Sequence, residues 1–229
     1  MSRDPFQPPP PTWSNAGFLA RVVSLDDPEQ RGRVRIRLLA FDGVAQQDAA
    51  IWARVAAPFA GNDRGAFFLP DVDDEVFVML VQGDPRYPVI VGGLWNGAAS
   101  PPAEIESGGV NRYKRIKSKN GIVVTLDDQQ GQETLKLETP GGQKLTLKDG
   151  PGSVTIEDAN GNSIKLEAAG ITIQAAAKVK VEAAQVEVSA GMVTVDSAMA
   201  KFSGVVKCET LITNAVISSS YTPGAGNVW

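Results

Sequence analysis

The chain has 229 residues, of which 43% are hydrophobic, and it carries a formal net charge of -4 without a single histidine. This hydrophobic content suits a folded protein with one large domain or two small ones, and the net charge argues against nucleic acid or an anionic membrane as default partners. Without histidine, Ser-His-Asp triads, Cys-His pairs and histidine metal sites cannot be built. The single cysteine excludes an intramolecular disulfide and a zinc site of the CxxC type.

The N-terminal arm, residues 1–15, contains the run QPPPPTW, which favours a polyproline II conformation. Its sequence lacks the apolar core of a signal peptide, and no run of about eighteen apolar residues occurs in the chain. We therefore expect synthesis in the cytoplasm without a signal peptide.

Residues 16–96 are expected to form a small β-barrel. Clusters of Asp, Pro and Gly separate five β-rich runs, which are GFLARVVSL, GRVRIRLLAF, AAIWARVAAPF, EVFVMLVQG and PVIVGGLW. Trp52 and Trp95 in these runs are expected to be barrel or interface anchors. Arg54 shares a strand face with Trp52, where it could pair with a carboxylate of a neighbouring subunit.

Residues 97–120 lose the apolar periodicity and gain Pro, Gly and charge, which indicates a connector. The basic cluster NRYKRIKSKNG near its end is expected to contact acidic loops of the barrel. Neighbouring carboxylates occur at 26–27, 73–75 and 127–128, but adjacent strand residues point to opposite faces and these groups lie beside turn residues. We therefore predict no catalytic residue, no metal site and no cofactor.

Residues 121–217 repeat one short strand pattern. An apolar-polar-apolar triplet occurs eight times between Leu135 and Val195, and the gaps between triplets shorten toward the C-terminus. Residues i and i+2 lie about 200° apart on a helix, so the two aliphatic side chains share a face only in a strand. The predicted core residues from the later triplets are Ile171, Ile173, Val179, Val181, Val186, Val188, Val193 and Val195.

A solenoid made by one chain would have only two or three coils, few enough that capping them would be difficult. Three chains give a better solution, in which each chain contributes one side of a triangular prism and no strand edge remains along the shaft. Backbone hydrogen bonds are then expected to link the three chains at each level.

Six motifs occur in a fixed order between residues 32 and 96, namely GRV, WxRV, FLP, DEV, GDPxxPV and LWN. This ordered set resembles the gpV/VgrG-type spike proteins of contractile phage tails and related injection systems. The resemblance implies an all-β homotrimer, in which an N-terminal OB-fold barrel precedes an intertwined triple-stranded β-helix needle. It also implies a non-enzymatic central spike that organises the baseplate and the tube end and pierces the target envelope when the sheath contracts.

The same resemblance implies assembly into a phage tail or an injection particle, extracellular or anchored to a membrane. Its expected partners are the baseplate hub, the inner-tube proteins and a PAAR-type tip protein. The C-terminal tip segment, residues 218–229, offers Tyr221, Pro223 and Trp229 as docking residues for such a protein, or folds back to cap the needle itself. The connector is too short for the lysozyme domain of large phage spikes, and the absence of histidine excludes the histidine-bound iron of some needle tips.

Two other functions are consistent with parts of the sequence. A monomeric β-solenoid that binds or acts on glycans would need an acidic and aromatic groove. An OB-fold module for single-stranded nucleic acid would need stacking aromatic side chains beside Arg33, Arg35 and Arg37. No row of Tyr or Phe accompanies these arginines, so no nucleic-acid partner is expected.

Overall fold

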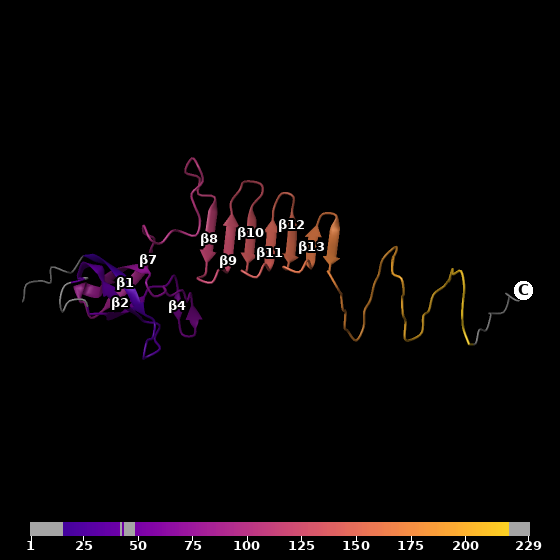
Figure 1. Cartoon of the computed structure of the whole chain (residues 1–229), viewed down its shortest axis with the longest axis horizontal. Helices are drawn as coiled ribbons and strands as arrows, with labels where there is room; N and C mark the ends of the chain where they lie inside the picture. The colour runs from indigo at the N-terminus through magenta and orange to yellow at the C-terminus, as the bar shows by residue number, and fades with distance from the viewer. Residues whose placement is uncertain (1–15, 42, 44–48, 220–229) are drawn as a thin grey trace, which may run out of the picture. The chain divides into compact units, whose positions relative to one another are not determined.

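A computed structural model describes residues 16–41, 43 and 49–219 of an all-β protein (Figure 1). The proline-rich arm lies outside the described residues, and so do the docking candidates Tyr221, Pro223 and Trp229. The described residues contain no helix with the length and apolar content that a membrane span requires. The chain divides into two compact units, residues 1–178 and residues 179–229.

Five strands of the first unit close into a barrel in the order β1-β2-β3-β7-β6. Side chains alternate along each strand, so that Val22, Ile36, Ala53 and Val78 are fully buried in a shared core. Neighbouring strands are antiparallel, except that β3 and β7 are parallel. The barrel confirms the five predicted runs, which form β1 (Gly17–Ser24), β2 (Val34–Leu38), β3 (Ile51–Val55), β6 (Glu75–Leu80) and β7 (Pro88–Leu94).

Four short elements complete the barrel region. The 3-10 turns η1 (Leu39–Phe41) and η2 (Val81–Gly83) follow β2 and β6 directly. A hairpin of β4 (Ala60–Gly61) and β5 (Arg64–Gly65) lies between β3 and β6 in the chain. The sequence did not predict this hairpin, because strands of two residues are too short to show an alternating pattern.

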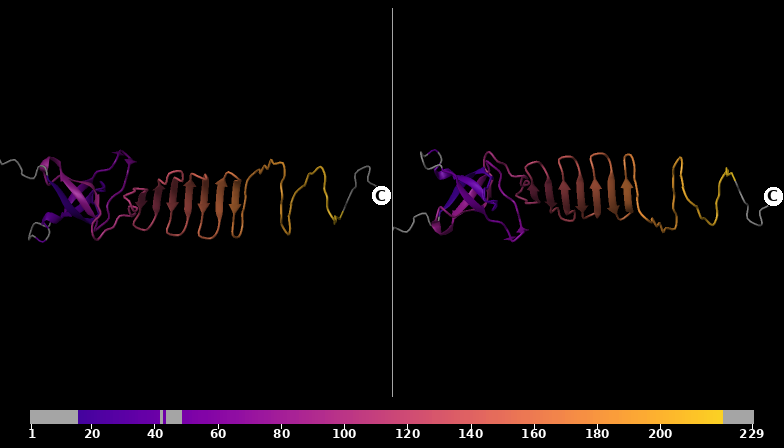
Figure 2. Two further views of the ribbon diagram at one scale, coloured as in Figure 1. Left: turned by 90° about the horizontal axis from the view of Figure 1, so that it is seen from above. Right: turned by 90° about the horizontal axis from the view of Figure 1, so that it is seen from below.

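Seven antiparallel strands follow the barrel in a single sheet, whose spatial order is the order in the chain (Figure 2). Every strand has five residues and pairs in full register with its neighbours. The strands are β8 (Tyr113–Lys117), β9 (Val123–Asp127), β10 (Thr134–Glu138), β11 (Lys144–Lys148), β12 (Ser153–Glu157), β13 (Ser163–Glu167) and β14 (Gly170–Gln174).

Two features of this sheet differ from the prediction. Strand β8 lies inside the expected connector, where the run YKRIK shows no strand signal because it holds one aliphatic residue, Ile116, among three cations. The backbone hydrogen bonds of β8–β14 join strands of the same chain rather than three chains. The tight turns between consecutive strands explain this, since they bring neighbouring strands of one chain together at low entropic cost.

The loops at one end of the strands shorten along the chain. They comprise residues 128–133 after β9, 149–152 after β11 and 168–169 after β13. The turns at the other end keep the same length, at residues 118–122, 139–143 and 158–162. Because the loops shorten at one end of the strands and not at the other, they project less from that end toward the C-terminus. The decreasing spacing of the triplets predicts this change.

The three equal turns share one hydrogen-bonding pattern. In each, the first residue donates its backbone N–H to the carbonyl of the fifth, and its side-chain oxygen accepts the N–H of the fifth. The fourth residue is a glycine with φ between 84° and 90°, a left-handed conformation that favours glycine. The pairs of first and fourth residues are Ser118 with Gly121, Thr139 with Gly142, and Asp158 with Gly161.

The same turns stack on one another along the edge of the sheet. A Cβ at Gly121 would lie 3.3 Å from the Pro140 ring, and a Cβ at Gly142 would lie 3.0 Å from the Ala159 Cβ. Each of these glycines therefore faces the second residue of the next turn at close range, which a larger side chain would prevent.

The second compact unit has a different local structure. Residues 179–219, the part of it that the structure describes, contain no regular strand. Their aliphatic side chains are exposed in the single chain, for example 69% for Val188 and 72% for Val195. The repeat pattern continues here, but among these residues it forms no strand pairing within the chain.

Candidate functional site

One face of the β8–β14 sheet is almost entirely aliphatic. The full register aligns the side chains in two columns that cross the sheet from strand to strand. One column begins at Lys114, and all other positions on this face are Leu, Ile or Val. The aliphatic members are Ile116, Val124, Leu126, Leu135, Leu137, Leu145, Leu147, Val154, Ile156, Ile164, Leu166, Ile171 and Ile173.

This aliphatic face is open to solvent in a single chain. The exposed fraction is 37% at Leu135 and reaches 70% at Ile171 on the last strand. Full burial of an exposed Leu or Ile side chain contributes about 1.5–3 kcal/mol, and each of these partly exposed side chains would gain a share of that, so a face of this size favours association with another apolar surface. The contiguous aliphatic columns are therefore the candidate association surface of the sheet.

The opposite face of the sheet is polar. Its central column runs through Lys136, Thr146, Thr155, Lys165 and Thr172, each the middle residue of a triplet. This separation of aliphatic and polar side chains is the one that the alternation predicts. An association through the aliphatic face would leave this polar face in water.

The predicted core residues fall into two groups. Ile171 and Ile173 lie on the aliphatic face, on the last strand of the sheet. The other six, Val179, Val181, Val186, Val188, Val193 and Val195, belong to the second unit, where the single chain forms no strand among the described residues.

The count of triplets missed the first part of this face. Val124 and Leu126 precede the first counted triplet, although Val124-Thr125-Leu126 has the same pattern and could have been found. Ile116 gave no such signal, because its strand neighbour on the same face is Lys114.

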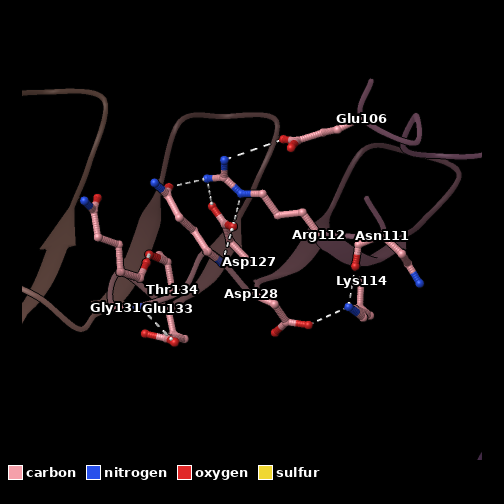
Figure 3. A network of polar contacts seen from close by, with 11 residues as sticks. Glu106, Asn111, Arg112, Lys114, Asp127, Asp128, Gly131, Glu133 and Thr134 are labelled. Carbon is pink, nitrogen blue, oxygen red and sulfur yellow. Dashed lines mark hydrogen bonds and ion pairs between the residues drawn. The ribbon is translucent and has the colours of Figure 1, made fainter. Parts of the chain in front are cut away.

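A polar network fixes the first strands of the sheet (Figure 3). The Arg112 guanidinium donates to both carboxylate oxygens of Asp127, and its Nη2 also donates to Gln129 Oε1 at 2.7 Å. Arg112 Nη1 lies 3.5 Å from Glu106 Oε1, and Lys114 forms an ion pair with Asp128. These contacts join the chain before β8 to the strand β9.

This network shifts the pKa values of Arg112 and Asp127. The hydrogen bond from Arg112 lowers the pKa of the Asp127 carboxyl, and the same bond raises the pKa of Arg112. The Tyr113 ring also lies close to two guanidiniums, 4.9 Å from Arg112 and 5.8 Å from Arg115. Such contacts contribute about 0.5–1 kcal/mol each at exposed sites.

The basic cluster therefore differs from its predicted role. Arg112 and Lys114 pair with carboxylates that end or follow β9, instead of with acidic loops of the barrel. Among the residues that the structure describes, Lys119 alone forms an ion pair of the expected kind, at 3.6 Å from Asp71 Oδ1. Pairing within the sheet prevails because the register places Tyr113 opposite Asp127, so Arg112 and Lys114 flank the carboxylates at the end of β9.

In the barrel, Asp27 organises the loop before β2. Its carboxylate accepts backbone N–H groups of Glu29, Arg31 and Arg33, at 2.8–3.2 Å, and the Nη2 of Arg33 at 2.7 Å. The hydrogen bond from Arg33 is the main cause of the low pKa of Asp27. The Arg33 guanidinium also lies 5.5 Å from the centre of the Trp52 ring.

At least one carboxylate in each of the three neighbouring groups considered for catalysis is thus bound in a structural contact. Asp27 pairs with Arg33, Asp127 pairs with Arg112, and Asp74 Oδ2 accepts the backbone N–H of Asp71 at 2.8 Å. The sequence predicted that these carboxylates are solvated turn residues. The burial of Asp27 was missed, because no local sequence pattern indicates which carboxylate the loop before β2 encloses.

A second carboxylate fixes the turn between β12 and β13. Asp158 accepts the backbone N–H groups of Asn160 and Asn162, both at 2.9 Å, and the Asn162 side-chain amide at 2.7 Å. The bonds from Asn162 are the main cause of the fall in the pKa of Asp158 to about 2. Asn162 Oδ1 in turn accepts the N–H of Ala176 at 2.9 Å, which ties the chain beyond β14 to this turn.

Two family descriptions match the regions just described. Residues 18–95 match the type VI secretion system/phage-baseplate injector OB domain, and residues 134–199 match the phage baseplate V C-terminal trimerisation domain. The first match covers the barrel strands. The second covers strands β10–β14 and continues into the second unit, so the aliphatic face lies largely within a trimerisation domain.

Curated relatives show the same relationship. The chain is 25% identical over 129 residues to the type VI secretion system spike protein VgrG1c of Pseudomonas aeruginosa, covering 53% of this chain and 18% of the relative. It is 30% identical over 112 residues to VgrG4b of the same species, covering 47% and 14%. It is 26% identical over 140 residues to the actin cross-linking toxin VgrG1 of Vibrio cholerae, covering 57% and 13%.

The chain spans less than a fifth of the length of these curated relatives. The two family matches nevertheless lie in the order that the motifs predicted, and they confirm the resemblance. Because the injector OB domain and the trimerisation domain follow each other on one polypeptide, the chain belongs to the baseplate V family of gpV/VgrG-type proteins.

Proposed function

We propose that this chain is the central spike of a contractile injection machine, with a structural and not a catalytic role. Three copies associate through the aliphatic face of the sheet, and the barrels organise the baseplate at the tube end. The C-terminal residues form the needle that pierces the target envelope when the sheath contracts. The observation that carries this proposal is the unbroken aliphatic face of β9–β14, which is exposed in one chain.

Threefold symmetry supports the proposal because it gives this face a partner of the same kind. Three sheets that turn their aliphatic columns toward one axis bury them together and keep the Lys and Thr column outside. A dimer of flat sheets would also cover the face, but the matching trimerisation domain favours three copies.

The second unit supports a needle. Its triplets keep the aliphatic-polar-aliphatic pattern of β14, although its described residues form no strand pairing within a single chain. Neighbouring copies would supply hydrogen-bonding partners in an intertwined needle, and no strand edge would remain exposed along it. We further propose that residues 218–229, with Tyr221, Pro223 and Trp229, complete the tip by docking a PAAR-type protein or by folding back.

A truncation after Lys178 tests this division of roles in the native particle. It removes the second unit and keeps the barrel and the sheet. We expect particles that still assemble a sheath and a baseplate but no longer penetrate target cells, as measured by electron microscopy and by a killing or dye-uptake assay.

The full-length chain supplied on a plasmid is the control, and it should restore penetration. Target penetration by the truncated particles at the full-length rate would contradict the proposed needle. Normal baseplates in particles that lack the whole chain would contradict the role of the barrel.

A further inference from the structure

The positive charges of this chain are divided sharply by residue type. Every cation before Lys114 is an arginine, and every cation after Arg115 is a lysine. Arginine is therefore the only basic residue type in the barrel region, whereas lysine is the only basic residue type in the sheet beyond β8 and in the second unit. Arginine is enriched in protein interfaces and lysine is depleted there, because the guanidinium is weakly hydrated and binds carboxylates with two parallel hydrogen bonds.

Four of these arginines lie on one outer wall of the barrel. Val22, Ile36 and Ala53 point into the core, so the alternate positions of β1, β2 and β3 point outward. Register places Arg21 opposite Arg37, and Arg35 opposite Trp52. The arginine wall, as we name it, consists of Arg21, Arg35, Arg37 and Arg54 around Trp52.

The arginine wall has an excess of positive charge in a protein with net charge -4. Arg21, Arg35 and Arg54 are exposed, and in the part of the chain that the structure describes no carboxylate forms an ion pair with any of the three. Arg21 lies opposite Arg37 on β2 and opposite Glu75 on β6, so an opposite charge faces it across one strand pair only. An anionic surface placed against the wall would bring carboxylates to the exposed guanidiniums of Arg21, Arg35 and Arg54.

We propose that the arginine wall is a docking surface for a carboxylate-rich face of another protein of the assembly. This proposal rests on the proposed baseplate role and names the chemistry of the partner that the barrel binds. Trp52 supplies the aromatic anchor of such an interface, because Trp and Arg are among the residue types that dominate binding energy at protein interfaces. The Asp27–Arg33 pair holds that anchor in place, since the Arg33 guanidinium lies against the Trp52 ring.

Single-stranded nucleic acid fits the wall less well. Base stacking needs an open aromatic face, and Trp52 is half-buried with Arg33 against its ring. A bidentate arginine-carboxylate contact needs only the end of an Asp or Glu side chain.

The test uses the full chain and two fluorescent probes, decaglutamate and an oligothymidylate, with binding followed by fluorescence anisotropy at low salt. We expect wild-type protein to bind decaglutamate despite its own negative charge, and to bind the oligothymidylate more weakly. Arg35→Ala with Arg54→Ala should weaken decaglutamate binding by about tenfold or more, because two charge-assisted contacts are lost.

The matched control is Lys144→Ala with Lys165→Ala, which removes two cations from the polar face of the sheet and should leave decaglutamate binding unchanged. Failure of wild-type protein to bind decaglutamate would overturn the proposal, as would an equal loss in the control. Tighter binding of the oligothymidylate would overturn it too and identify a nucleic-acid surface instead. The mass of each variant in solution is measured alongside, so that loss of the trimer, which bears on the proposed spike, is distinguished from loss of the docking surface.

Discussion

Single charged residues fix loops in this protein, and Asp27 is the clearest example. Its carboxylate accepts three backbone N–H groups and pairs with Arg33, so one side chain determines the course of the loop into β2. Arg33 lies against Trp52, and the same carboxylate therefore also positions the aromatic side chain of the arginine wall. Asp158 has the equivalent role in the turn before β13.

Replacement of Asp27 by Asn should lower the thermal unfolding midpoint of the barrel by several degrees at neutral pH. The folded pKa of Asp27 is below the ordinary value of 3.8, so its contribution is complete above that value and is lost as pH falls toward the folded pKa. The difference between wild type and Asp27→Asn should therefore shrink on acidification below about pH 4. Thermal unfolding followed by circular dichroism at several pH values measures this difference in the unfolding midpoint.

Asp26→Asn is the matched control, because Asp26 is the exposed neighbour of Asp27. It should leave the unfolding midpoint unchanged at every pH. If the unfolding midpoint at neutral pH dropped equally in the two variants, Asp27 would have no special role in the loop.

Among the elements, the repeated turns explain how seven short strands keep one register. Each turn closes with the same backbone and side-chain bonds, and the glycines of the first two turns pack on the turn that follows. A shift of register by one residue would carry every aliphatic side chain to the polar face, so constant turn geometry protects the aliphatic face.

Gly142→Ala should destabilise the sheet by about 1–3 kcal/mol, because an L-residue at φ 87° is strained and the new Cβ would lie 3.0 Å from the Ala159 Cβ. For a domain of this size that corresponds to a drop of about 2–4 °C in the unfolding midpoint for each kcal/mol. Thermal unfolding of the purified variant measures the drop.

Gly152→Ala is the matched control, because the same substitution there adds a Cβ that has no close neighbour. Gly152 is exposed, and a Cβ added there would have the Lys148 carbonyl oxygen as its nearest neighbour, at 4.0 Å. The midpoint should change little. A larger loss at Gly152 than at Gly142 would refute the stacking of the turns.

The elements also show how far the sequence predicts the fold. The five barrel strands were found because Val, Ile and Ala at alternate positions mark an inward face. Strand β8 was missed because its pairing with β9 depends on Arg112, Asp127 and their neighbours, which lie far apart in the sequence. The aliphatic pairs on β10–β14 were found, but the choice between bonding within a chain and bonding between chains depends on turn geometry that alternation does not encode.

At the scale of the whole molecule, burial of the aliphatic columns is a property of the assembly. Val186→Asp should open the needle, because three carboxylates near one axis lack partners and each uncompensated buried charge costs about 3–5 kcal/mol. The sheet still joins the three copies, so sedimentation velocity should still detect a trimer, whereas limited proteolysis should cut the second unit faster than in wild type.

Thr194→Asp introduces the same charge at the polar centre of a later triplet and is the matched control. It should leave the second unit as resistant to proteolysis as in wild type. Resistance that survives Val186→Asp but not Thr194→Asp would show that the inward and outward faces of the needle have been assigned the wrong way round.

The mass of the full-length chain in solution tests the central claim, threefold association through the aliphatic face, most directly. We expect a single species at three times 24.2 kDa, measured by sedimentation equilibrium, that persists in mild detergent because the aliphatic faces of three sheets are buried together. A monomer of 24.2 kDa at micromolar concentration, with its aliphatic face in water, would contradict it.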